Sequence, residues 1–220
     1  GGLIAYVPFD GTAVDVAGSN AVVLGGSPTY VKTQGAFYKG LSCGTLETNI
    51  SDNASISNVL GSKVGTIALW YYARGPWYNY QTIFDNTVHS EYWECWIAAD
   101  GKLAARVSNK TGGGDIRYSL DNLHGPDNWY HVAFVWDLGM GQTQLYVDGV
   151  CRGTGTLTDG GWIDPNSTLN LAGGHKYNVK GTGIWDEVRV YDRALTDAEI
   201  AALAVVPPAP PPGGTVFTLR

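Results

Sequence analysis

Two carboxylates three residues apart, Glu91 and Glu94 in the segment HSEYWECW, come closest to a pair that could do acid–base chemistry. Hydrolysis of a glycosidic bond needs two carboxylates about 5–10 Å apart that converge on that bond. The segment is predicted to be a strand, and an offset of three residues in a strand puts two side chains on opposite faces. Glu91 and Glu94 therefore cannot converge, and this pair does not predict a hydrolase.

Other catalytic and metal-binding patterns are missing from the sequence. It contains neither HExxH nor a GxSxG elbow, and the TGGGD segment at 111–115 lacks the Lys-Ser/Thr of a phosphate loop. The four histidines have no partners at ligand spacing: His89, His124, His131 and His175. We therefore expect a protein that is not an enzyme.

A cluster of aromatic and amide side chains lies in the segment RGPWYNYQ, residues 74–81. Sugars stack on exposed aromatic faces, and neighbouring amides bond to their hydroxyls. The sequence thus predicts a glycan site formed by Trp77, Tyr78, Asn79 and Tyr80. The alternative is that these rings cover the core from outside or pack on a neighbouring subunit, since aromatic residues are equally useful in protein interfaces.

The elements that would position such a loop are strands. Residues 65–74 (GTIALWYYAR) and 129–137 (WYHVAFVWD) are β-branched and aromatic on both faces, as in inner strands buried on two sides. Asp100-Gly101 and Asp148-Gly149 predict two-residue hairpin turns, because both central positions of such turns need positive φ. We predict an all-β fold, a two-sheet antiparallel jelly-roll sandwich.

One short helix is predicted near Thr196–Ala204. Thr196 and Glu199 have the spacing of a capping box, and Leu195 and Ile200 that of a hydrophobic staple. Pro207 prevents any extension of the helix. The globular domain is accordingly predicted to span residues 1–206.

Composition limits the partners. The chain has 220 residues, a net charge of −6 and no basic block, so nucleic acid is not an expected partner. It has no apolar run of the roughly 20 residues that a membrane helix needs, so no membrane insertion is expected. The chain opens on Gly1-Gly2 without a Met, and we take it as a processed or excised piece of a secreted or cell-surface protein.

The cysteines and sequons are compatible with such a setting. Cys43, Cys95 and Cys151 match no zinc pattern and are expected to be buried free thiols, or one disulfide and one free thiol. Four Asn-x-Ser/Thr sequons are candidates for glycosylation: Asn49, Asn53, Asn109 and Asn166.

Several segments together resemble the laminin-G-like domain of the concanavalin A-like lectin/glucanase superfamily. They are YVPFDG at 6–11, WYHVAFVWD at 129–137, LYVDGV at 145–150 and GIWDEVRVYDRALTDAEIAAL at 183–203. The resemblance runs from about Leu3 to Val205 and implies two stacked antiparallel sheets, an extracellular setting, and roles in glycan binding, adhesion or architecture. His131 lies in the strand pattern of that family and is expected to be structural. The E-x-D-x-x-E pattern of the related glucanases is absent.

The resemblance also implies a structural calcium ion. By that resemblance its ligands are Asp186 and the acidic loop with Asp10 and Asp15, with further oxygens from backbone carbonyls. The alternative is that Asp10 and Asp15 only shape turns, and that Asp186 caps a backbone group or pairs with a basic residue such as Arg189.

The C-terminal residues form two distinct segments. Residues 207–214 contain five prolines and end in two glycines, which predicts a polyproline II spacer with a hinge. Residues 215–220, TVFTLR, have the alternation of a strand, and a single strand needs an existing sheet edge to pair with.

Three roles for this strand remain open. It could add to the sheet of a second copy, with Val216, Phe217 and Leu219 making the contacts; it could begin a further domain; or it could dock on its own domain. Head-to-tail strand addition would make a fibre or surface layer from copies of this chain. We therefore predict a non-enzymatic extracellular subunit that assembles in this way; the alternative is a carbohydrate-binding or adhesion module of a larger secreted protein.

Overall fold

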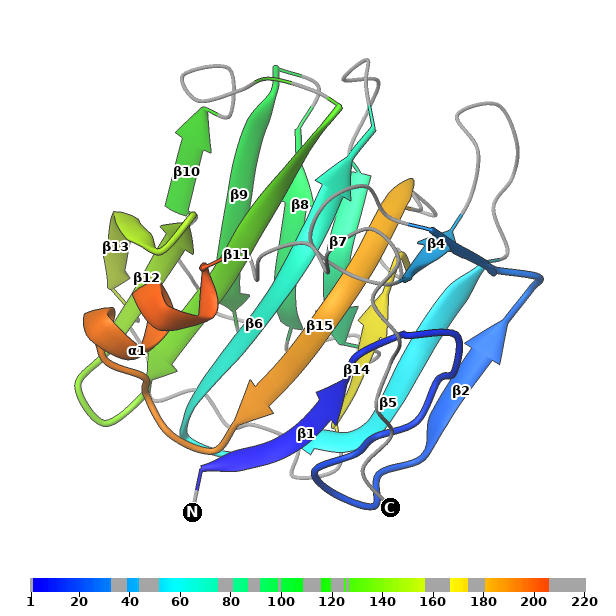
Figure 1. The fold of residues 1–220 in the computed structure, drawn as a ribbon. Coiled ribbons are helices and arrows are strands. Elements are labelled where there is room, and N and C mark those ends of the chain that lie inside the picture. The colour runs from blue at the N-terminus through cyan, green and yellow to red at the C-terminus, as the bar shows by residue number, and fades with distance from the viewer. Residues whose placement is uncertain are drawn as a thin grey trace.

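The computed structural model describes residues 2–32, 39–43, 52–74, 81–86, 92–98, 100–108, 116–119, 125, 127–156, 167–173 and 181–205. In this part of the chain fifteen strands form two antiparallel sheets, and one helix lies on the outside (Figure 1). The predicted all-β sandwich is confirmed. The spacer at 207–214 and the strand at 215–220 lie outside the described residues.

The first sheet has eight strands in the order β13-β12-β11-β6-β15-β4-β3, and β1 also pairs with β15. Its strands are β1 (Leu3–Val7), β3 (Thr29–Val31), β4 (Gly40–Cys43), β6 (Val64–Ala73), β11 (Asn128–Asp137), β12 (Gln142–Val147), β13 (Val150–Thr156) and β15 (Gly183–Tyr191).

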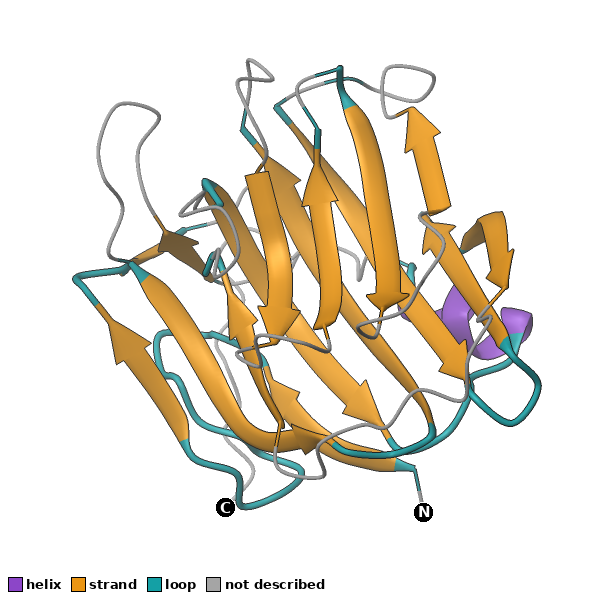
Figure 2. Cartoon of the chain, turned by 180° about the vertical axis from the view of Figure 1, so that it is seen from behind, coloured by secondary structure: helices purple, strands orange, loops and turns teal. Residues whose placement is uncertain are grey.

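The second sheet has seven strands in the order β10-β9-β8-β7-β14-β5-β2 and comes to the front when the molecule is seen from behind (Figure 2). Its strands are β2 (Val22–Gly25), β5 (Asn53–Leu60), β7 (Gln81–Asn86), β8 (Tyr92–Ile97), β9 (Lys102–Ser108), β10 (Ile116–Ser119) and β14 (Ser167–Leu171).

Strands β6 and β11 are the inner strands that the sequence predicted. They pair with each other over ten residues, from Asn128↔Ala73 to Asp137↔Val64. Nearly every residue of both is buried, because their inner faces meet the second sheet and their outer faces are also covered. Continuous β-branched and aromatic sequence is the pattern that two buried faces require.

Large aromatic side chains fill the space between the sheets. Trp93 of β8 packs edge-on against Trp136 of β11, with ring centroids 5.6 Å apart. Trp185 of β15 donates its indole N–H to the carbonyl of Ile83 in β7, at 2.8 Å. Gly65 is required beside them, because a Cβ there would lie 2.2 Å from Cζ2 of Trp136.

The two predicted hairpin turns have different outcomes. Asp148 and Gly149 have φ values of 52° and 76° between the paired residues Val147 and Val150, so this two-residue turn is confirmed. At the other hairpin, the N–H of Ala98 donates to the carbonyl of Lys102, which makes the loop three residues long, 99–101. The two-residue prediction there is wrong, because Gly101 takes the left-handed position of a three-residue loop.

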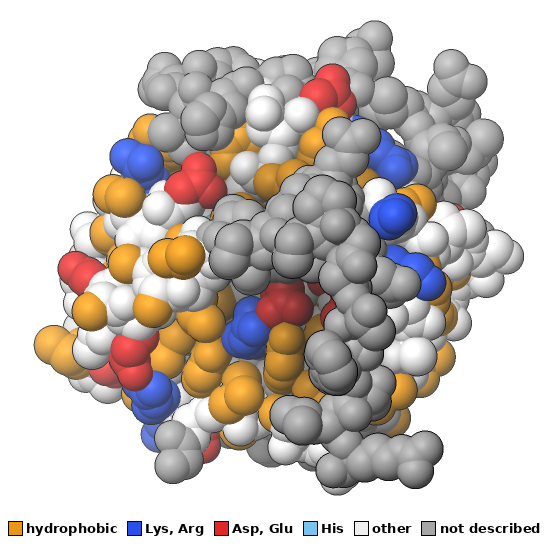
Figure 3. Space-filling view, viewed as in Figure 1, with side chains coloured by type: hydrophobic (Ala, Val, Ile, Leu, Met, Phe, Trp, Pro, Cys, Tyr) orange, Lys and Arg blue, Asp and Glu red, His pale blue; other side chains and the backbone are white. Residues whose placement is uncertain are grey.

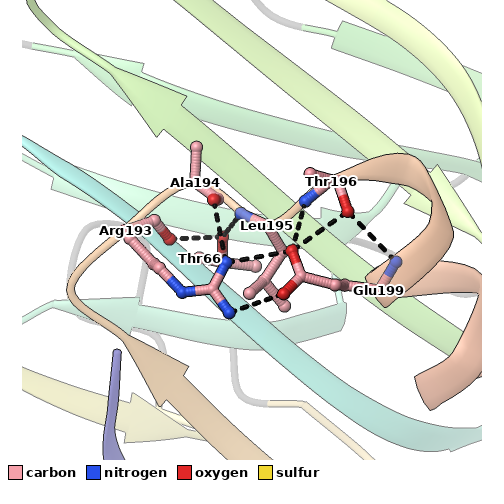
Figure 4. Close-up of polar contacts among 6 residues, drawn as sticks. All are labelled: Thr66, Arg193, Ala194, Leu195, Thr196 and Glu199. Carbon is pink, nitrogen blue, oxygen red and sulfur yellow. Dashed lines mark hydrogen bonds and ion pairs between the residues drawn. The ribbon is translucent and has the colours of Figure 1, made fainter. Parts of the chain in front are cut away.

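Helix α1 (Asp197–Leu203) begins at the predicted N-cap, Thr196, and both arms of the capping box with Glu199 are formed. The staple residues Leu195 and Ile200 are buried in one cluster on the outer face of the first sheet. Arg193 adds an ion pair to Glu199 (Figure 4).

A single hydroxyl ties the approach to this helix to β6 (Figure 4). Thr66 is fully buried; its Oγ1 donates to the carbonyl of Arg193 at 2.9 Å and accepts from the N–H of Leu195 at 3.0 Å. The hydroxyl thus satisfies two backbone groups where the chain turns from β15 toward α1.

The cysteines are all free: Cys43 and Cys95 are buried, and Cys151 is partly exposed. Among the sequons, Asn53 begins β5 and is partly buried. Asn49, Asn109 and Asn166 lie outside the described residues. The structure's one described helix, α1, is too short to cross a membrane.

Replacing Thr66 by Val is expected to lower the free energy of unfolding by about 1–3 kcal/mol, because Val keeps the shape but leaves two backbone groups without a partner. Thr154→Val, at an exposed position of β13, is the matched control and should change it by less than about 0.5 kcal/mol. Urea denaturation measures both, and equal stabilities would contradict the role given to Thr66.

Candidate functional site

Asp15 organises the loop after β1. Its Oδ1 accepts the N–H groups of Tyr6, Ala17 and Gly18 at 2.8–3.0 Å, and its Oδ2 accepts from the backbone N–H and the side-chain amide of Asn20. Burial opposes ionisation, but these bonds, led by that from Gly18, hold the pKa of Asp15 below its usual value. Both oxygens are engaged, so Asp15 fits the alternative role of shaping the loop better than that of a metal ligand.

Asp186 is in a different environment. It is fully buried in β15, beside a bulge at which Glu187 has a φ of 55°. Its Oδ1 accepts the N–H of Glu187 at 2.9 Å, and its Oδ2 has no hydrogen-bond partner. Burial, followed by the negative charges of Glu187 and Asp10, raises the pKa of Asp186 to about 9. With no cation beside it, a carboxyl with such a pKa carries its proton at neutral pH.

An ion pair lies next to Asp186 on the outer face of the first sheet. Arg189 pairs with Glu187, and its guanidinium lies 4.2 Å from the ring centroid of Tyr6. The hydroxyl of Tyr6 donates to the carboxylate of Glu187 at 2.9–3.0 Å. Acidic and basic side chains lie side by side among hydrophobic ones near the centre of this face (Figure 3).

His131 lies on the same face, in register with Trp70, which is in turn in register with Asp186. It is 1% exposed, and its Nδ1 has no hydrogen-bond partner. Burial, together with the charge of Arg189, lowers the pKa of His131 to about 4. A neutral, buried imidazole packed edge-on against Trp70 agrees with the structural role expected for His131.

The calcium prediction now rests on two of its three aspartates. Within the described ranges, no group of three or more His, Cys, Asp or Glu side chains is arranged to hold a metal. Asp186 nevertheless fits a cation on chemical grounds, because it has an unpaired buried oxygen and negative neighbours that include Asp10. Asp186 and Asp10 would hold the ion, which would supply charge compensation and no chemistry.

A second polar feature, which sequence reasoning missed, crosses the outer face of the second sheet. We call it the cross-strand row: Arg106 of β9, Glu94 of β8, Asp85 of β7, Asn170 of β14 and Ser55 of β5. Each residue is in register with the next one across the sheet.

Hydrogen bonds connect most of the row. Arg106 donates from Nε and Nη2 to Oε2 of Glu94, at 3.1 and 2.7 Å. The amide of Asn170 donates to Asp85 at 3.0 Å, and Ser55 donates to the Oδ1 of Asn170 at 2.9 Å. Asp85 and Glu94, two carboxylates, stand opposite each other in the middle of the row.

Trp96 lies beside this row, two residues after Glu94 on the same face of β8. Its neighbours across the strands are Ala104 of β9 and Thr82 of β7, and the guanidinium groups of Arg106 and Arg117 lie 5.2 and 6.0 Å from its ring centroid. Its indole Nε1 has no hydrogen-bond partner. This face thus combines an aromatic ring, carboxylates, an amide and guanidinium groups.

The other predicted site residues are not described by the structure. Trp77, Tyr78, Asn79 and Tyr80 lie in the undescribed segment 75–80, which joins β6 to β7. The tail residues Val216, Phe217 and Leu219 likewise lie outside the described ranges. The glycan site at the 75–80 loop and the assembly role of the tail therefore remain predictions.

Comparison with known proteins agrees with the geometry. Residues 48–201 match the model of a laminin G-type family that is described as the concanavalin A-like lectin/glucanases superfamily. This match covers more than half of the chain. The chain belongs to the concanavalin A-like lectin/glucanases superfamily. The resemblance of the sequence to that superfamily is thereby confirmed.

Solved structures with the same fold include one domain of an extracellular arabinanase. Domain 4 of AbnA, a GH43 extracellular arabinanase from Geobacillus stearothermophilus, was solved in complex with arabinotriose. It has a TM-score of 0.74 and 19% identity, and the alignment covers 92% of this chain and 98% of that domain.

Receptor-binding domains of botulinum neurotoxins share the fold as well. The structure from botulinum neurotoxin type C, whose cell entry is dependent upon interaction with two ganglioside molecules, has a TM-score of 0.74 and 16% identity over 92% of this chain. The type DC domain, in complex with rat synaptotagmin II, has a TM-score of 0.72 and 17% identity over 92% of this chain. This chain spans about half the length of these toxin domains. A search of the curated proteins found no significant match.

Chelation tests the calcium prediction for Asp186. We expect excess EDTA to lower the melting temperature of the wild-type protein and to leave that of Asp186→Asn unchanged, because an amide is a much weaker calcium ligand than an ionised carboxylate. Asp15→Asn is no suitable control, since it disturbs the loop; Asp100→Asn, in an exposed ion pair, is one. A wild-type melting curve that EDTA does not move would remove calcium and leave Asp186 as a neutral structural acid.

Proposed function

We propose that this domain is a non-enzymatic carbohydrate-binding or adhesion module of a secreted or cell-surface protein. The observation that carries the proposal is the agreement in fold along nearly the whole of domain 4 of AbnA, which was solved with arabinotriose. Fold alone does not select a function, but the neighbours described above are domains that bind glycans or receptors rather than domains that cleave them.

The arrangement of the carboxylates supports binding over hydrolysis. A glycosidase needs one carboxyl that carries a proton to the leaving group. Two N–H groups of Arg106 donate to one oxygen of Glu94, and Asp85 accepts from Asn170, so both carboxylates already serve as acceptors within the sheet. Glu91, the partner considered from the sequence, lies outside the described residues.

A glycan array gives the direct test of sugar binding. We expect the wild-type domain to bind at least one neutral glycan and Trp77→Ala to bind it at least about tenfold more weakly, because stacking on an aromatic ring is lost. Asn79→Ala should weaken binding less. Met140→Ala is the control, since Met140 is a large apolar side chain that is 77% exposed on a turn. Binding that survives Trp77→Ala would dismiss this loop as the site.

A second candidate function is assembly through the C-terminal strand, and the exposed apolar edge of the second sheet supports it. Strand β2 is an edge of that sheet, and Val23 and Leu24 on it are 57% and 36% exposed. Val14 and Val16, which precede it, are 53% and 60% exposed. An exposed apolar edge strand is a site where another strand can add.

Electron microscopy tests assembly. We expect fibres from the intact chain and monomers from a chain that lacks residues 207–220, because the added strand would be gone. Val23→Lys, which places a charge on the β2 edge, should also abolish fibres, whereas Met140→Lys should not. Monomers from the intact chain at high concentration would exclude assembly and leave the tail as a linker.

A further inference from the structure

Aromatic side chains continue along the outer face of the first sheet beyond the cluster that packs under α1. Trp129 of β11 pairs edge-on with Tyr72 of β6, with ring centroids 5.5 Å apart. His131 pairs in the same way with Trp70, at 5.4 Å. We call these four side chains the aromatic quartet. The next residues along both strands on this face are alanines of the cluster under α1, so the quartet extends the apolar surface that the helix covers.

The quartet is well covered for side chains on an outer face. Trp70 is 5% exposed, His131 is 1% exposed, and Trp129 and Tyr72 are partly buried. In the described part of the chain, Trp70 belongs neither to the cluster under α1 nor to the core between the sheets. Burial of this degree on an outer face requires further chain to lie over the strands. The cover is therefore a part of the protein beyond these two clusters.

The chain leaves the described fold beside the quartet. At the end of α1, Ala204 lies against the turn between β12 and β13, because a Cβ on Gly149 would be 3.1 Å from that of Ala204. The other residue of that turn, Asp148, exchanges two hydrogen bonds with His131: its N–H donates to the carbonyl of His131 at 2.8 Å, and its Oδ1 accepts the N–H of His131 at 2.9 Å. The segment that follows Val205 thus starts close to the quartet.

The composition of that segment suits an aromatic surface. Residues 207–212 read PPAPPP, and extended proline-rich segments bind grooves that are lined by aromatic rings. Five of these six residues have no N–H group, so the segment can be buried without bringing many donors that need a partner. It carries no charge, and His131 is neutral at pH 7 because burial lowers its pKa to about 4.

The length of the segment also fits. As a polyproline II helix, six residues span about 19 Å at about 3.1 Å per residue. The quartet measures about 7 Å along the strands and about 5 Å across them. Residues 207–212 can therefore cross the quartet completely while Val205 stays at the end of α1.

We propose that the aromatic quartet is the docking site of residues 207–212 of the same chain, so that the proline segment lies on the domain's own first sheet. The segment is then part of the fold, and it determines where the strand at 215–220 begins. The inference does not depend on glycan binding. It concerns residues 207–212, whereas assembly concerns the strand at 215–220.

Modification of His131 by diethylpyrocarbonate tests the docking in the intact chain. The reagent attacks neutral imidazole, so at pH 7 the rate reports access to His131, and peptide mass spectrometry separates it from the other histidines. We expect removal of residues 207–220 to raise this rate at least about tenfold, because the cover is lost. Removal of residues 215–220 alone is the matched control and should leave the rate within about twofold, since the proline segment remains.

The buried thiols show whether the shortened chain keeps its fold. Cys43 and Cys95 should stay unreactive toward a maleimide, as in the wild type. If they react, the measurement passes to the full-length double variant Pro208→Asp with Pro211→Asp, which puts two charges over an apolar surface and should raise the rate at His131 as the deletion does. Thr215→Asp with Thr218→Asp adds the same charges outside residues 207–212 and should leave the rate unchanged.

The outcomes identify what covers the quartet. Faster modification of His131 in the deletion and in the proline variant, with both controls unchanged, supports the proposal. A wild-type rate in the deletion or in the proline variant means that another segment of the chain provides the cover, and it overturns the proposal. A wild-type rate that rises when the protein is diluted means that the segment docks on a second copy, and it likewise overturns docking within one chain.

Discussion

Contact between the two sheets through indole rings is the constraint on which the rest of this fold depends. Trp93 and Trp136 meet edge to face, and Trp185 bonds to a backbone carbonyl of the opposite sheet. Gly65 has no side chain because the ring of Trp136 occupies that space. Since the inner faces are committed to each other at native packing density, variation for function is confined to loops, edges and the two outer faces.

The outer faces of the two sheets both carry titratable side chains, but the two sets of side chains are stabilised in different ways. On the first sheet, His131, Trp70 and Asp186 lie in register, and burial keeps both titratable groups neutral at pH 7. On the second sheet, Arg106 is paired with Glu94 in the cross-strand row. A face made of neutral groups can be covered at little electrostatic cost, whereas charged groups are buried at lower cost when they are paired, as Arg106 and Glu94 are.

The elements that depend on interactions between residues close together in the chain were predicted from the sequence. Strands β6 and β11, the capping box of Thr196 and the turn at 148–149 follow from patterns within a few residues. The cross-strand row could not be predicted in this way, because Asn170 is 85 residues from Asp85 and 115 from Ser55 in the chain. The sequence paired Glu94 with Glu91 by proximity, whereas the carboxylate opposite Glu94 in the sheet is Asp85, on a neighbouring strand.

The three free thiols differ in chemical reactivity. Burial raises the pKa of Cys43 to about 12, and it also raises that of Cys95, so neither forms the reactive thiolate at neutral pH. Cys151 is partly exposed on β13, next to the cluster that holds α1. The chain thus has one partly exposed thiol, on the opposite sheet from the cross-strand row, and because all three cysteines are free the fold holds no disulfide that a reducing agent could break.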